Sequence, residues 1–203
     1  NSVISDIAPT IYTMTPAGII CSGAVIGIDN SETGATYQLR LNGVLNMGAA
    51  VDGTGSAISF GEQYLPGIYT AIATNMKGCS SLMNGEVEVN ANPVAFNVTP
   101  SAAQCPPVKI GINGSETGVN YILVLENSIQ IDTLQGTGTA LSFGAQTTSG
   151  NYTVLAYNAA TLCKTEMNGT AVIKPAPISY PMTPAGILCP GTPIGLANSE
   201  AGV

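Results

Sequence analysis

The sequence predicts an all-β protein built from tandem repeats, and three observations carry this prediction. Of the 203 residues, 45% are hydrophobic but only 8% are charged, and 24 Gly and 13 Pro are present. The polar remainder is mostly Ser, Thr, Asn and Gly, which favour short strands and tight turns over helices. The same short sequences also return at a fixed interval along the chain, as they do in repeat proteins.

The interval is 84 residues, and it is marked by a cysteine, a Thr-Pro pair and an acidic turn sequence. These markers are Cys21, Cys105 and Cys189; Thr15-Pro16, Thr99-Pro100 and Thr183-Pro184; and residues 30–34, 114–118 and 198–202. The chain therefore divides into a lead-in (1–9), unit 1 (10–93), unit 2 (94–177) and a third segment (178–203). The lead-in matches the last strand of a unit and the third segment matches the first two strands. We expect the natural protein to continue at both ends.

Each unit contains about seven runs of β-branched and aromatic residues bounded by Gly, Pro and Asn, the number typical of an immunoglobulin-like sandwich. In unit 2 these strands are predicted near 94–99, 108–113, 120–126, 128–133, 140–143, 151–157 and 164–173. Short junctions containing Pro favour extended, stiff connections. The units are therefore predicted to stack end to end as a rod.

Tyr69 and Tyr152 each follow a Gly by two positions at the start of the predicted sixth strand. This placement predicts a tyrosine corner, in which the hydroxyl donates a hydrogen bond to backbone a few residues upstream. The alternative is an ordinary strand tyrosine held only by packing.

Taken together, the recurring motifs resemble the immunoglobulin-like repeats of very large secreted surface proteins of Bacteroidota. The motifs are a Cys, Ser-Glu-Thr-Gly-Val-Asn-Tyr, Gly-Thr-Gly-x-Ala-x-Ser-Phe-Gly, Gly-x-Tyr-Thr, a second Cys and Met-Asn-Gly, with the best match at 115–121 and 136–144. Unit 1 departs from the pattern at Ala35-Thr36. The resemblance implies export by the type IX secretion system, an extracellular or cell-surface location, and a role in adhesion or gliding.

Catalytic and cofactor chemistry is not predicted. The chain has no His, which removes the commonest base and metal ligand. Glu32, Glu116 and Glu200 recur once per unit, which favours a turn structure over catalysis or a Ca²⁺ site. The five basic residues are scattered singly, so no nucleic-acid footprint is present. No apolar run approaches the length of a membrane span.

The predicted function is that of a structural segment of a long cell-surface stalk, fibre or filament. Its partners would be the neighbouring repeats and other copies of the chain, because few charges protect the sheet edges. The alternative is a carbohydrate- or surface-binding adhesin module. Sugar-binding surfaces usually present aromatic rings, and this chain has no Trp, 8 Tyr and 3 Phe. Most of these recur between units and are expected in cores, whereas Tyr64 and Tyr157 do not recur and are the candidates for exposure.

Asp132-Thr133-Leu134 is similar to the Asp-Thr-aliphatic site that Bacteroidota use for O-glycosylation. The resemblance therefore implies that Thr133 is modified.

Five cysteines in a chain of this kind predict disulfides. One pairing joins the two cysteines of each unit, Cys21 with Cys79 and Cys105 with Cys163, and leaves Cys189 for a partner further on. The first cysteine, however, precedes the second strand and the other precedes the seventh, and these positions lie at opposite ends of an immunoglobulin-like sandwich. The other pairing therefore joins Cys21 to Cys163 across the junction, with Cys105 and Cys79 pairing into the flanking units. The sequence leaves both pairings open.

Overall fold

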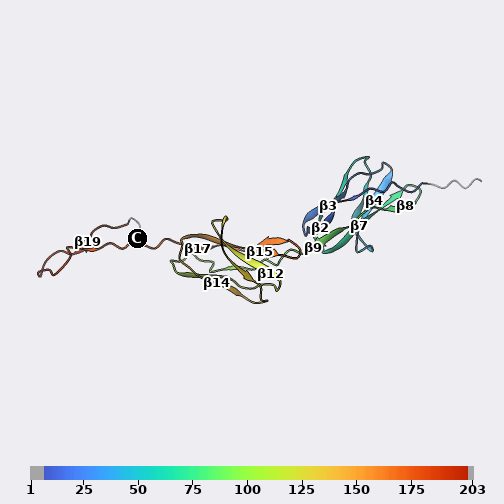
Figure 1. The fold of residues 1–203 in the computed structure, drawn as a ribbon. Helices are drawn as coiled ribbons and strands as arrows, with labels where there is room; N and C mark the ends of the chain where they lie inside the picture. The colour runs from blue at the N-terminus through green and yellow to red at the C-terminus, as the bar shows by residue number, and fades with distance from the viewer. Residues whose placement is uncertain (1–6, 201–203) are drawn as a thin grey trace, which may run out of the picture.

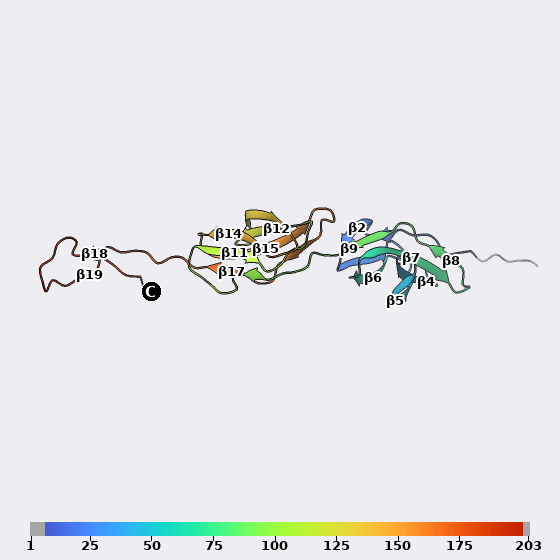
Figure 2. The same ribbon diagram turned by 90° about the horizontal axis from the view of Figure 1, so that it is seen from below.

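The structure of the protein is a computed structural model that describes residues 7–200. The described residues form strands, turns and extended segments, with no helix among them. Figures 1 and 2 show two sandwiches that follow one another along the chain, with the third segment beyond the second sandwich. The predicted all-β, immunoglobulin-like fold is confirmed.

The first sandwich consists of a three-stranded sheet facing a six-stranded sheet. The three-stranded sheet has the order β1-β3-β6, and the larger sheet has the order β2-β9-β7-β4-β5 with β8 also paired to β7. The strands are β1 (Met14–Thr15), β2 (Gly18–Cys21), β3 (Ala24–Ile28), β4 (Ala35–Leu41), β5 (Leu45–Asp52), β6 (Ile58–Gln63), β7 (Gly67–Asn75), β8 (Ser80–Leu82) and β9 (Val87–Asn90).

The second sandwich repeats this arrangement. Its small sheet has the order β10-β11-β14, and its larger sheet has the order β13-β12-β15-β16 with β17 also paired to β15. The strands are β10 (Val98–Thr99), β11 (Val108–Ile112), β12 (Val119–Leu125), β13 (Ile129–Gln135), β14 (Leu141–Gln146), β15 (Gly150–Asn158), β16 (Lys164–Glu166) and β17 (Ala171–Ile173).

Each sandwich has its own core, built from residues that alternate along the strands. In β12 the burial alternates from Val119 to Leu125, which places Tyr121 and Leu123 in the core at 0% exposure. Tyr37 and Leu39 occupy the same places in β4, also at 0% exposure. The alternating apolar pattern in the sequence therefore fixes the register of the central strands in both units.

The strand predicted over residues 164–173 is wrong as a continuous strand. β16 pairs with one end of β15 and β17 pairs with the other end, and residues 167–170 form a bulge between them. At this bulge Asn168 N donates to Phe96 O at 2.8 Å, and Val98 N donates to Asn168 O at 2.8 Å. At the recurring Met-Asn-Gly motif, the chain between β16 and β17 therefore pairs with the first segment of the unit. Of the predicted first strand, only Val98–Thr99 lie in a strand, where they pair with β11.

The third segment contains one antiparallel pair, β18 (Met182–Thr183) and β19 (Gly195–Leu196). It matches the pairing of β1 with β3 and of β10 with β11. Met182 and Leu196 are each 60% exposed, whereas their counterparts Val98 and Ile112 are buried. The segment thus has the first pairing of a unit without its core. The prediction that the lead-in is a last strand falls largely on residues 1–6, outside the described residues.

Candidate functional site

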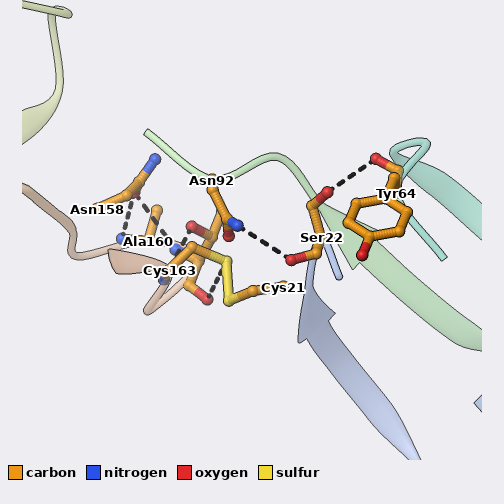
Figure 3. The surroundings of a disulfide bond; sticks show 8 residues. Cys21, Ser22, Tyr64, Asn92, Asn158, Ala160 and Cys163 are labelled. Carbon is orange, nitrogen blue, oxygen red and sulfur yellow. Dashed lines mark hydrogen bonds between the residues drawn. A yellow bond between two sulfur atoms is a disulfide. The ribbon is translucent and has the colours of Figure 1, made fainter. Parts of the chain in front are cut away.

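The junction between the two sandwiches brings together two of the recurring cysteines, and it is the candidate functional site. Cys21 at the end of β2 is bonded to Cys163, which lies in the turn before β16, with a Cα–Cα distance of 5.6 Å (Figure 3). The two residues are 142 positions apart in sequence and belong to different sandwiches. Of the two pairings open from the sequence, the structure has the one that crosses the junction.

The pairing of Cys21 with Cys79, and by repeat that of Cys105 with Cys163, is not formed in the structure. Cys21 is in register with Asn90, beside the Gly67 end of β7, whereas Cys79 O accepts from Asn75 N at the other end. β7 has 9 residues, so the two cysteines are separated by roughly 25–30 Å along the sandwich. Bridged Cα atoms must lie within about 7 Å of each other, which explains why one disulfide does not span a unit.

On the side of unit 1, the residue after Cys21 is held by three hydrogen bonds. Ser22 N donates to Asn90 O at 2.8 Å, and its hydroxyl donates to Tyr64 O at 2.8 Å. Asn92, in the linker, donates from Nδ2 to Ser22 O at 3.0 Å (Figure 3). The linker and the disulfide-bearing turn are therefore fixed to each other. Ser22 and Asn92 were not among the sequence candidates, because unit 2 has Pro106 and Ala176 at these positions and no repeat marks them.

On the side of unit 2, a compact turn from Asn158 to Cys163 presents the second sulfur. Asn158 N donates to Cys163 O at 2.9 Å, Leu162 N donates to Asn158 O at 2.8 Å, and the Asn158 side chain accepts from Ala160 N at 3.0 Å. Leu162 has a φ of 62°, and its counterpart Gly78 has a φ of 84°. This turn therefore requires a left-handed residue just before the cysteine, at a cost when that residue is not Gly.

The recurring glutamates hold the entry segment of each unit. Glu116 Oε2 accepts a hydrogen bond from Val94 N at 2.6 Å, immediately after the linker. The same bond joins Glu32 to Thr10 N at 2.8 Å and Glu200 to Ile178 N at 3.0 Å. The predicted structural role of these residues therefore has a definite form, in which a carboxylate fixes the start of each repeat. The signal was present in the sequence as a constant offset of 22 residues between donor and acceptor.

Two further motifs keep Glu116 in place. Ser115 is 5% exposed, its hydroxyl donates to Thr139 O at 2.5 Å, and it accepts from Thr137 N at 3.1 Å. A Cβ added to Gly136 would lie 1.9 Å from Glu116 O, so only glycine fits there. Ser31 and Gly53 make the same contacts in unit 1. The Ser-Glu-Thr-Gly and Gly-Thr-Gly motifs are thus the two halves of one loop contact.

The tyrosines of the predicted corners lie in the two cores, at 0% and 1% exposure. Tyr69 donates from its hydroxyl to Leu65 O at 2.8 Å, and Tyr152 donates to Thr148 O at 2.9 Å. Burial raises the pKa of the Tyr69 phenol. Both bonds run to a backbone carbonyl four residues upstream, which is the geometry of a tyrosine corner.

The remaining sequence candidates lie away from the junction or at its edge. Tyr64 is 63% exposed and packs one ring edge over Gly23, and Tyr157 is half-buried beneath the ammonium of Lys164, 5.4 Å from the ring centroid. Thr133 is exposed on the edge strand β13, where its hydroxyl accepts from Gln130 Nε2 at 3.0 Å. Cys105 and Cys189 are exposed. Among residues 7–200, no group of three or more acidic or cysteine side chains is arranged to hold a metal ion.

The chain matches no known family profile and no curated protein in sequence. It is similar to solved structures. The fibronectin(III)-like modules of CbhA from Clostridium thermocellum are 13% identical, with 81% of this chain and 95% of that chain covered and a TM-score of 0.33. The immunoglobulin domains 1–4 of Sidekick-1 are 14% identical, with 84% of this chain and 48% of that chain covered and a TM-score of 0.36. Murine CEACAM1b is 12% identical, with 82% of this chain and 99% of that chain covered and a TM-score of 0.34. At these values the fold assignment rests on the strand order of this chain itself. No helix in the described part is long and apolar enough to cross a membrane.

Proposed function

We propose that this chain is a repeat segment of an extracellular stalk, fibre or filament that supports adhesion or motility at a cell surface. The observation that carries the proposal is the Cys21–Cys163 disulfide, which locks one sandwich to the next. A disulfide of this kind requires an oxidising compartment, which favours a location outside the cytoplasm. The resemblance of the repeats to secreted surface proteins of Bacteroidota points the same way.

We further propose that the cross-link repeats along the natural protein. Cys105 occupies the repeat position of Cys21, and Gln104 N donates to Val172 O at 3.0 Å just before it, so Cys105 lies beside the last strand as Cys21 does. It is exposed, as the partner of a following unit would require. A bond from Cys105 to the second cysteine of that unit would continue the series.

Electron microscopy of native cells labelled with an antibody against this chain tests the proposed location. We expect thin extended projections that carry the label along their length. Label confined to the cell interior would refute the stalk function. Binding of the two-unit chain to a glycan array would instead favour the adhesin alternative.

Two smaller proposals accompany this function. Thr133, exposed on an edge strand, is proposed to carry an O-linked glycan, and an intact mass of native material without added sugar would refute this. Copies are proposed to associate side by side through the edge strands β5 and β13, where Leu45 and Ile129 are 53% and 54% exposed. Sedimentation at high concentration tests the association: Ile129→Lys should reduce it and Ile129→Thr should not. Single chains throughout would count against it.

A further inference from the structure

The two ends of each sandwich determine how tension would pass through the chain. In unit 1 the chain arrives at the end where Asn75 Nδ2 donates to Ile7 O at 2.9 Å. Cys21 lies at the opposite end of β7, in register with Asn90. Residues 7–21 therefore cross unit 1 from end to end, and they deliver any pull directly to the sulfur of Cys21.

Unit 2 has a corresponding crossing segment, which runs from the junction to the end where the chain leaves the unit. Cys163 lies beside Asn158 at the far end of β15, and Ile173 pairs with Gly150 at the start of that strand. Residues 163–173 therefore cross unit 2 from the junction to the end where the chain leaves it. A pull received by Cys163 passes along this one segment.

The covalent path from residue 7 to residue 173 thus consists of two crossing segments and one disulfide. Residues 22–162 lie off this path, and they include strands β3 to β15, which supply most of both cores. The crossing segments hold little chain in reserve compared with the loop that the disulfide closes. Residues 7–21 and 163–173 exceed the 9-residue strands beside them by only about eight residues, or roughly 27 Å of slack.

We propose that this arrangement makes the chain an extension-limited tether, in which tension runs along the two crossing segments and bypasses the strands that supply most of both hydrophobic cores. The inference deepens the proposed stalk function by stating what the cross-link does under load. The bypassed loop has a sequence separation of 142 residues, so it holds about 480 Å of chain in reserve at about 3.4 Å per residue. While the disulfide is intact, neither sandwich can release that length, whatever its own stability.

Single-molecule pulling tests the inference directly. The full chain is held by peptide tags at its two termini, and its contour length is measured before and after reduction with a phosphine, which converts the disulfide to two thiols. The oxidised chain should release only the length outside the loop. Reduction, or the substitution Cys21→Ser without reductant, should add about 480 Å to the released contour. Cys105→Ser is the matched control and should behave like the oxidised wild type.

Release of the full loop length by the oxidised wild-type chain would overturn the inference, and this result does not depend on how any variant folds. The outcome is also separable from the proposed function. An oxidised chain that extends little, combined with native cells that show no labelled projections, would refute the stalk and leave the tether in place. Labelled projections built from chains that extend fully would support the stalk and refute the tether.

Discussion

Cys21 and Cys163 are bonded across the junction of two sandwiches, although 142 residues separate them in sequence. The bond joins the last residue of β2 in one unit to the turn before β16 in the next. Peptide mapping of the native protein under non-reducing conditions should therefore yield a linked pair of peptides that carry these two residues. A linked pair carrying Cys21 and Cys79 would show that the bridges lie within units.

Breaking the cross-link should destabilise the chain. A disulfide that closes a loop of this size reduces the entropy of the unfolded state by the equivalent of about 5 kcal/mol in the chain-entropy model. Cys21→Ser should lower the denaturation midpoint accordingly and should broaden the distribution of interatomic distances in small-angle scattering. Cys105→Ser, which changes an exposed thiol, should leave both measurements as they are. Equal midpoints for the two variants would contradict the structural role of the bond.

Glu116→Ala should loosen the entry to unit 2. The substitution removes the acceptor of the Val94 N–H, and we expect it to cost about 1 kcal/mol in the free energy of unfolding of that unit. Glu86 is exposed on the same chain, so Glu86→Ala serves as the control. Chemical denaturation monitors the effect, and equal stabilities of the two variants would show that the carboxylate is dispensable.

Tyr69→Phe and Tyr152→Phe should each cost roughly 1–3 kcal/mol, because each removes the donor of a part-buried hydrogen bond to a backbone carbonyl. Tyr64→Phe changes a 63% exposed residue and should cost much less. Denaturation of the three variants makes the comparison. If all three are as stable as the wild type, the core tyrosines act by packing alone.

Alkaline pH should unfold both sandwiches. Burial is the largest cause that raises the pKa of the Tyr37, Tyr69 and Tyr121 phenols above 10.0. The folded state therefore favours the protonated phenol, so this stabilisation is fully present below about pH 10 and is lost as the pH rises through the raised values. Phenolate absorbance and circular dichroism should change together in a pH titration. Complete phenolate formation with an unchanged dichroism spectrum would contradict this coupling.

Local rules explain why much of the fold follows from the sequence. The period of 84 residues shows how many units are present, and alternating apolar residues such as Tyr121 and Leu123 define the strands and the face that each strand buries. The sequence also gives an argument against a disulfide within one unit, because the length of a strand separates Cys21 from Cys79. Turn chemistry placed Glu116 in a loop, although its partner Val94 N was not identified.

Contacts between residues far apart in the sequence depend on how the units fold and pack. The bulge at residues 167–170 arises because Asn168 bonds to backbone of the first segment, some 70 residues earlier, and no local propensity encodes that contact. Ser22 and Asn92 likewise meet only once the last strand has returned to the end of the sandwich where β2 finishes. The repeat, the strands and the candidate cysteines therefore follow from local sequence patterns. The pairing of the cysteines depends on the end-to-end placement of two folded units, because that placement brings Cys21 and Cys163 within bonding distance.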